Sequence, residues 1–370
     1  MASDMDMEIY KKLRQHLEQN PIGFPATKSG VELRILKYLF TPLEAEIATY
    51  LKFSWLKDLE PLEEIYERVT ELGLSIEELE KNLDNMARKG AITSREAKGK
   101  KYYANAELMV GIFEYQVDKL TKEFIDDFHQ YVNEAWLKQA IKVKAAQVRT
   151  IPVEKSVESR SDIADYDNVR KMFSDSPGPF LVANCVCRQL KDIEGEPCKA
   201  TDRRELCLLF GAAAEVFDTQ GWGRAISKEE ALEILAKNQE EGLILQKDNS
   251  QGLDFICSCC TCCCEGLSKL TLLPNPGRLT LSNYVAHVDP ELCTGCGMCL
   301  DVCQLDAIIQ DNEISKINIM RCVGCGNCAS KCPSEAITLV EKERKYTPPT
   351  TFDELFEKII KQKSNINSKK

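Results

Sequence analysis

Cysteine is absent from the first 184 residues and from everything after Cys332, although the chain holds 18 cysteines. Long apolar runs are absent too. None approaches the roughly 18 uncharged residues of a membrane-spanning helix, so we expect no membrane span. The first residues are acidic where a signal peptide has basic and then apolar residues. We therefore expect a cytoplasmic chain, in a reducing compartment where closely spaced cysteines bind metals more often than they form disulfides.

Basic residues are in deficit: 48 lysines and arginines stand against 58 aspartates and glutamates, for a net charge of −10. This balance argues against a general nucleic-acid coat protein and against a basic membrane-surface protein. Hydrophobic residues make up 44% and charged residues 29%, which is typical of a globular chain, and 370 residues suggest two or three domains. The pattern along the chain predicts an α+β multidomain protein.

Residues 1–146 carry no cysteine and predict a mainly helical domain. Apolar residues at helical spacing predict a helix from Val31 to Phe40. Thr41 and Pro42 are typical of the N-cap and first turn of a second helix, which we expect to reach residue 51.

A third helix and a pair of strands follow in the same domain. Ser75 and Glu78 form a capping box for this helix, and Gly90 ends it. Two short strands around a lysine-rich turn at 97–101 come next, and we expect helix again over 111–146. Three helices followed by a two-stranded wing are the order of a winged helix-turn-helix, so the domain is predicted to be winged-helix-like.

A winged helix raises the question of DNA binding, in which a recognition helix enters the major groove. The best candidate, Ile76 to Lys89, is acidic in its N-terminal half, which would face phosphate. The wing is basic, with Arg95, Lys98, Lys100 and Lys101. We favour a protein-docking or dimerising role and keep DNA as the alternative.

A doubled cysteine motif near the C-terminus is the strongest signal. Cysteines at 293, 296, 299 and 303 repeat at 322, 325, 328 and 332, a period of 29 residues. Three cysteines at this spacing hold three corners of one iron–sulfur cubane, and the fourth binds the neighbouring cubane. The predicted ligands are Cys293, Cys296, Cys299 and Cys332 for one [4Fe-4S] cluster, and Cys322, Cys325, Cys328 and Cys303 for the other.

These eight cysteines resemble the bacterial-type 2[4Fe-4S] ferredoxin domain over about 60 residues. Gln304 stands where that pattern usually has a proline, as at Pro333. Because the proline donates no ligand, we expect only a local effect. Zinc is the alternative metal, but zinc ribbons use two CxxC pairs separated by a long gap.

Ten further cysteines lie in a central segment, six of them within the eight residues CSCCTCCC. They are Cys185, Cys187, Cys198, Cys207, Cys257, Cys259, Cys260, Cys262, Cys263 and Cys264. One tetrahedral ion takes four ligands, so they cannot all serve one ion. Their softness favours an additional iron–sulfur centre, with zinc or a redox-active, metal-free thiol cluster as alternatives. Arg188 either offsets thiolate charge or lies on the surface.

We expect the segments 185–207 and 257–264 to converge on one metal-rich site, because dense thiolates need a cation to offset their repulsion. In this prediction the strands FLVANC and DFICSC lie side by side, and helices over 203–219 and 228–241 pack behind them.

The predicted boundaries follow from these patterns. They are 1–146 for the winged-helix-like domain, 147–178 for a polar linker arm, 179–275 for a central cysteine-rich α+β domain, 276–345 for a C-terminal 2[4Fe-4S] ferredoxin-like domain, and 346–370 for a C-terminal helix and tail.

Nearly the whole chain also resembles a group of proteins from anaerobes described only as 4Fe-4S dicluster-domain proteins. The resemblance rests on SGVELRIL, FLVANCVCR, GRAISKEEALEIL and FICSCCTCCC together with the doubled motif. It implies iron–sulfur binding and electron transfer, without a defined reaction.

Three functions remain open. The first is an electron carrier or adaptor subunit of an anaerobic oxidoreductase system, with a redox partner protein. The second is a redox-sensing transcription regulator, and the third is an oxidoreductase that reacts at the central cysteines. His287, six residues before Cys293, is a candidate to tune a cluster by hydrogen bonding, whereas His16 and His129 are expected to be structural or surface residues.

Overall fold

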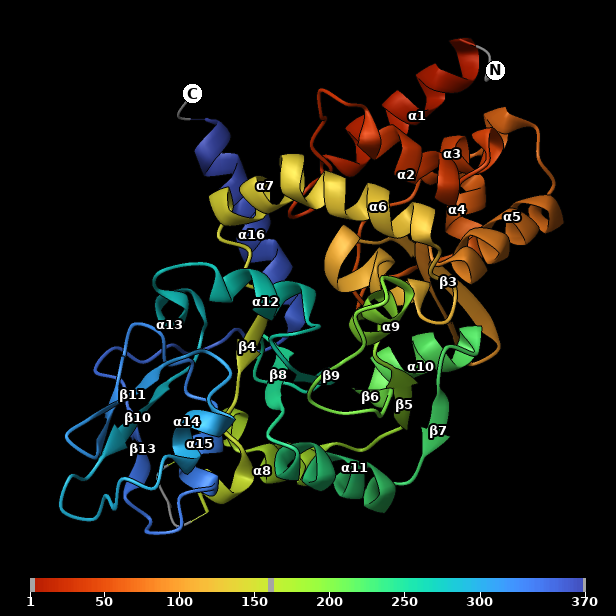
Figure 1. Ribbon diagram of the computed structural model, residues 1–370. Coiled ribbons are helices and arrows are strands. Elements are labelled where there is room, and N and C mark those ends of the chain that lie inside the picture. Colours follow the sequence, from red (N-terminus) through yellow and green to blue (C-terminus); the bar gives the residue numbers. More distant parts are fainter. Residues whose placement is uncertain (1–3, 159–162, 369–370) are drawn as a thin grey trace. The chain divides into compact units, whose positions relative to one another are not determined.

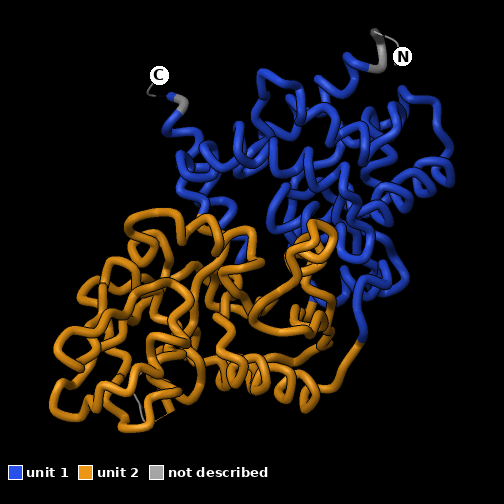
Figure 2. The backbone as a smooth tube through the Cα atoms, in the orientation of Figure 1, with its two compact units in different colours: residues 1–145, 212–224, 352–370 blue, residues 146–211, 225–351 orange. Residues whose placement is uncertain are grey.

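The computed structural model describes residues 4–158 and 163–368. The chain forms two compact units (Figure 2). We call residues 1–145, 212–224 and 352–370 the helical unit, and residues 146–211 and 225–351 the cysteine unit. Residues 159–162 of the expected linker arm lie outside the described part of the chain. No helix among the described residues is long and apolar enough to span a bilayer.

The helical unit begins with α1 (Asp4–Leu17), α2 (Val31–Leu39) and α3 (Pro42–Ala48). The predicted helix at 31–40 is confirmed. Thr41 caps α3: its hydroxyl accepts the Glu44 amide at 3.3 Å, and the Glu44 carboxylate accepts the Thr41 amide at 2.7 Å. This helix stops at Ala48, before the predicted end at residue 51.

A second group of elements carries the predicted wing. It contains β1 (Glu60–Pro61), α4 (Leu62–Arg68), α5 (Ile76–Lys89), β2 (Ile92–Ala97) and β3 (Lys100–Asn105), with strand order β1-β3-β2. The capping box of Ser75 and Glu78 is present on α5, and Gly90 ends the helix at a φ of 74°. The hairpin is therefore confirmed as local structure, whereas the winged-helix class stays a prediction.

The helix predicted from residue 111 begins later. Gly111 has a φ of 155° next to extended backbone, and a 3₁₀ turn (Glu114–Gln116) follows. Thr121 accepts the Phe124 amide at 3.2 Å and so caps α6 (Lys122–Tyr131). A π turn at Val132–Trp136 connects α6 to α7 (Leu137–Lys142), and α10 (Gly211–Gln220) and α16 (Phe352–Asn367) complete the unit. The sequence pattern predicted helix in this segment but not where the helix starts.

A six-stranded sheet with strand order β4-β8-β9-β6-β5-β7 forms the centre of the cysteine unit, and its strands from β4 to β5 in this order are antiparallel (Figure 1). The strands are β4 (Val148–Thr150), β5 (Phe180–Asn184), β6 (Glu205–Phe210), β7 (Arg224–Ile226), β8 (Ile244–Asp248) and β9 (Phe255–Cys259). Apolar side chains of α8 (Val169–Asp175) and α11 (Lys228–Glu240) share one core cluster with this sheet. The helix predicted over 228–241 is therefore confirmed.

Three predictions about this sheet are wrong. The segment 203–219 is strand β6 followed by α10, because its first apolar residues pair with β5 and β9. FLVANCVCR is strand only to Asn184, and α9 (Val186–Ile193) begins after Cys185. The strands FLVANC and DFICSC belong to one sheet but are separated by β6.

The expected linker arm is part of the sheet and its core. Its strand β4 pairs with β8, and its Ile151 and Val153 are buried in the core cluster. Arg149 and Asp167, both fully buried, form an ion pair within this segment, and Asn283 donates to Asp167 at 2.9 Å. A buried ion pair is stable only if further hydrogen bonds compensate for the loss of water around its charges, and Asn283 provides one. The polar residues of the expected arm can therefore be buried.

The end of the cysteine unit repeats a small motif twice. The first copy has α14 (Met298–Val302) and the second has α15 (Asn327–Ser330). The hairpin of β11 (Ile308–Asp311) and β12 (Ile314–Ile317) lies between them in sequence, and β10 (Tyr284–Val288) pairs with β13 (Ile337–Glu341). Two short helices, α12 (Glu265–Thr271) and α13 (Pro276–Leu279), connect the sheet to this region.

Candidate metal centres

The two repeats of the doubled motif share one backbone geometry. Gly295 and Gly324 have φ of 68° and 70°, and Gly297 and Gly326 have φ of 79° and 80°. A Cβ on Gly295 would lie 2.3 Å from the Glu313 carbonyl oxygen. Only glycine therefore fits these turns, which wrap the chain tightly around each group of cysteines.

Four cysteines of the crossed set line one cavity. Cys322, Cys325 and Cys328 of the second run are joined there by Cys303, which comes from the first run. The other walls are mostly apolar, from residues such as Val302, Ile308 and Val323, and include the polar residues Gln304 and Asn327. Four soft sulfur donors in an apolar cavity are the donor set that a [4Fe-4S] cluster requires.

Backbone amides donate to the sulfurs of both sets. The Ala286 amide donates to Cys322 Sγ at 3.4 Å, the Ala307 amide to Cys303 Sγ at 3.3 Å, and the Ser315 amide to Cys293 Sγ at 3.5 Å. Such bonds favour electron-rich sulfur and are part of how a protein tunes a cluster.

The two sets differ in burial. Cys322 and Cys328 are buried, and burial raises the pKa of Cys325 to about 12. Cys296 of the first set is exposed, and the backbone amides of Ser315 and Gly295 lower the pKa of Cys293. The set of Cys303, Cys322, Cys325 and Cys328 is therefore enclosed by the cavity, whereas the other set, although its Cys299 is buried, reaches the protein surface at Cys296.

Gln304, the departure from the ferredoxin pattern, has a structural role. Its Nε2 donates to the Gly242 carbonyl at 2.7 Å, and its Oε1 accepts the Thr261 amide at 3.0 Å. Thr261 lies inside CSCCTCCC, so this side chain joins the doubled motif to the central cysteines. A proline has no side chain that could make either bond.

The ten central cysteines separate into two groups instead of converging on one site. In the four-sulfur group (Cys198, Cys260, Cys262 and Cys263) all sulfurs lie within 4.8 Å of one another. Four of the six separations between these sulfurs are 3.6 Å for Cys198–Cys260, 3.9 Å for Cys198–Cys262, 3.4 Å for Cys260–Cys262 and 3.6 Å for Cys262–Cys263.

The remaining six thiols, which we call the six-thiol group, form a chain of side-chain contacts. The order is Cys185, Cys187, Cys264, Cys259, Cys257 and Cys207. Cys257, Cys259 and Cys264 belong to the same apolar cluster as Cys322 and Cys328 of the doubled motif. The six-thiol group is therefore packed against the ferredoxin-type region.

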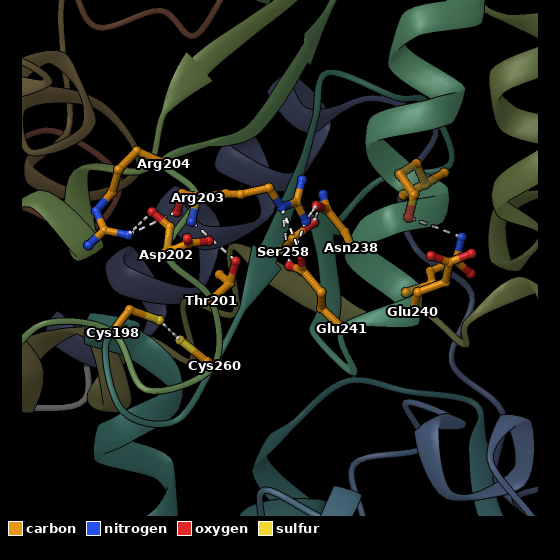
Figure 3. Close-up of polar contacts among 12 residues, drawn as sticks. Cys198, Thr201, Asp202, Arg203, Arg204, Asn238, Glu240, Glu241, Ser258 and Cys260 are labelled. Carbon is orange, nitrogen blue, oxygen red and sulfur yellow. Dashed lines mark hydrogen bonds and ion pairs between the residues drawn. The ribbon is translucent and has the colours of Figure 1, made fainter.

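Local backbone geometry explains the division. Cys257 and Cys259 are two residues apart on β9, so they share one face, while Ser258 on the other face accepts a hydrogen bond from Asn238 at 2.7 Å (Figure 3). The strand ends at Cys259, and the turn that follows directs Cys260, Cys262 and Cys263 to the second group. Cys264 caps α12 by accepting the Leu267 amide at 3.4 Å.

Arg188 connects the two groups. Its side chain is fully buried and donates to Cys185 Sγ at 3.3 Å, Cys198 Sγ at 3.4 Å and Cys260 Sγ at 3.3 Å. Burial lowers the pKa of this guanidinium. The negative charges of the Cys185 and Cys260 thiolates raise the pKa by more than burial lowers it, so the net shift is upward. The surface alternative for this residue is therefore excluded, and its position directly after Cys187 was the signal that pointed to it.

Cys198 is the most acidic thiol of the four-sulfur group. Burial raises its pKa, but the amides of Ala200 and Thr201 and the Arg188 guanidinium lower it to about 6. Nearby, Arg203 pairs with Glu241 at 2.6 Å and donates to Asn238 at 2.6 Å (Figure 3). These contacts fix the loop that carries Cys198.

The histidines do not line these groups. His287 is exposed on β10, and its neighbour Ala286 provides the amide for Cys322 instead. His16 Nε2 lies 2.7 Å from the Leu51 carbonyl oxygen, a structural contact in the helical unit.

Paired glycine turns, amide-to-sulfur bonds and a four-cysteine cavity define an iron–sulfur protein region of the ferredoxin type. Residues 286–333 match the family model of the 4Fe-4S dicluster domain. No curated protein and no solved structure matches the chain.

Proposed function

We propose that this protein is an iron–sulfur electron-transfer protein, the carrier or adaptor subunit of an anaerobic oxidoreductase system with a redox partner protein. One [4Fe-4S] cluster is held by Cys293, Cys296, Cys299 and Cys332, and the other by Cys322, Cys325, Cys328 and Cys303. An additional iron–sulfur centre is held by the six-thiol group. When bound, such clusters accept and release single electrons.

The observation that carries this proposal is the cavity lined by Cys303 together with Cys322, Cys325 and Cys328. It matches the crossed ligand set expected from the cysteine spacing, and it lies in the segment that matches the 4Fe-4S dicluster family.

A surface-exposed cluster set supports a protein partner. Cys296 is exposed, and Leu292 and Met298, close to it in sequence, are 51% and 46% exposed. Exposed apolar side chains next to a cluster ligand suit the docking of another protein. The enclosed set and the adjoining six-thiol group are then positioned to relay electrons away from this surface.

Cys303→Ser tests the crossed ligation. In protein purified without oxygen, we expect this variant to lose about four irons and the EPR signal of the enclosed cluster, because Cys303 completes that set. Cys293→Ser is the matched control and should remove the signal of the exposed cluster instead. If Cys303→Ser perturbs the same signal as Cys293→Ser, the crossed assignment is wrong. A wild-type protein without iron and sulfide would overturn the proposed function as a whole.

A further inference from the structure

The four-sulfur group has the dimensions of a single-ion site. Zinc binds thiolate sulfur at about 2.3 Å, so the edges of a ZnS₄ tetrahedron measure about 3.8 Å. The separations given above, between 3.4 Å and 3.9 Å, agree with these edges. In a cubane each cysteine binds a different iron, and two irons with bridging sulfides then separate any two cysteine sulfurs. The four sulfurs are too close together for that arrangement.

We propose that Cys198, Cys260, Cys262 and Cys263 bind one zinc ion tetrahedrally, at a site separate from the six-thiol group. Four protein sulfurs leave no open position, which is typical of structural rather than catalytic zinc.

The surroundings suit the charge of such a site. One Zn²⁺ with four thiolates carries a net charge of −2, and the four displaced thiol protons go to solvent. Arg188 offsets part of this charge by donating to two of the four sulfurs, Cys198 and Cys260. Donors of this kind orient metal ligands and strengthen metal binding.

The location gives the ion a structural task. Cys198 lies in the chain between α9 and β6, which has neither helix nor strand, whereas the other three ligands follow β9. A zinc ion would cross-link this loop to the turn that carries Thr261. Gln304, the residue after Cys303, already accepts a hydrogen bond from this turn. The site would thereby fix the turn between the six-thiol group and the ferredoxin-type region.

Metal analysis of the full chain, purified without oxygen, tests the proposal. We expect about one zinc per chain. Cys198→Ser and Cys263→Ser should each lose this zinc and keep the wild-type iron content. The matched control, Cys187→Ser in the six-thiol group, should keep the zinc. Loss of iron with retention of zinc in Cys198→Ser would overturn the proposal.

X-ray absorption at the zinc edge is a second test of the site. It uses the wild-type protein, so its result does not depend on whether the cysteine variants fold. Four sulfurs at about 2.3 Å would support the site. Absence of zinc, a mononuclear iron in its place, or nitrogen and oxygen ligands would overturn it. The zinc content and the iron content are measured separately. A protein that contains zinc but no iron would contradict the proposed electron-transfer function and would still support the zinc site.

Discussion

The side-chain oxygen of Gln304 accepts a hydrogen bond from the backbone amide of Thr261 at 3.0 Å. This contact joins the residue after Cys303, a predicted cluster ligand, to the residue after Cys260, in the four-sulfur group. The same side chain donates to the Gly242 carbonyl, which also accepts from Asn327 at 2.7 Å. The side-chain amide of Gln304 thus connects the two cysteine-rich segments of the cysteine unit.

Gln304→Ala should destabilise the protein by about 1–2 kcal/mol, because it leaves the Thr261 amide without its partner and removes one of the two donors to the Gly242 carbonyl. Gln304→Pro, which restores the usual ferredoxin residue, should do the same. Thermal unfolding of the iron-loaded protein measures both. Gln310→Ala is the control, since Gln310 is exposed and makes one bond, to the Gly295 carbonyl. Equal unfolding midpoints for the Gln304 variants and wild type would contradict this role.

Arg188→Gln should weaken zinc binding by about 10- to 100-fold, the range seen when a donor to a metal ligand is lost. Arg188→Lys should not restore it, because one ammonium cannot reproduce the planar fork that reaches Cys185, Cys198 and Cys260. Competition with a chelator measures the affinity. The control is Arg204→Gln, which removes an exposed ion pair with Asp192. The same affinity loss in both glutamine variants would rule out a specific role.

Glu107 in the helical unit should make stability depend on pH. It is fully buried and accepts the Ile22 amide at 2.9 Å, and burial raises its pKa from 4.5 to about 8. Between these values the folded state binds more protons than the unfolded state, so stability should fall as pH rises from about 4.5 to 8.

Glu107→Gln should remove this fall, because the amide stays neutral. The free energy of unfolding of the variant minus that of wild type should be larger at pH 8 than at pH 5. The increase should be a few kcal/mol at most, since one pKa unit corresponds to about 1.4 kcal/mol. Thermal midpoints at the two pH values measure the difference. Glu63→Gln, at an exposed position, should leave the wild-type pH dependence in place. An unchanged profile in Glu107→Gln would contradict the prediction.

The helical unit should bind DNA weakly and without sequence preference. Lys101 of the wing pairs with Glu80 at 2.9 Å and Asp84 at 2.7 Å, both on the candidate recognition helix α5. The charge of this wing lysine is therefore already offset by the helix that would have to approach phosphate. Fluorescence anisotropy of the full chain with mixed duplex DNA at low salt measures this. Sequence-selective binding that persists at physiological salt would favour DNA binding over protein docking for this unit, and with it a transcription regulator.

Local patterns determined much of the helical unit and the motif of the ferredoxin-type region. The capping box of Ser75 and Glu78 and the N-cap at Thr41 were readable because each depends on residues within one turn of the helix. The cysteine spacing and its glycines indicated a dicluster region for the same reason: the first three ligands of each cluster come from one short segment.

Only the tertiary structure decided how the central cysteines divide. Cys259 and Cys260 are neighbours in sequence but belong to different groups, because β9 ends between them. The register of β9 is set by pairing with the preceding strand β8 and with the more distant strand β6. The burial of Arg188 among three sulfurs, the two bonds of Gln304, and strand β4 in the expected arm likewise depend on segments far apart in the chain. Such contacts follow from the packing of the whole sheet, which local propensity and spacing do not encode.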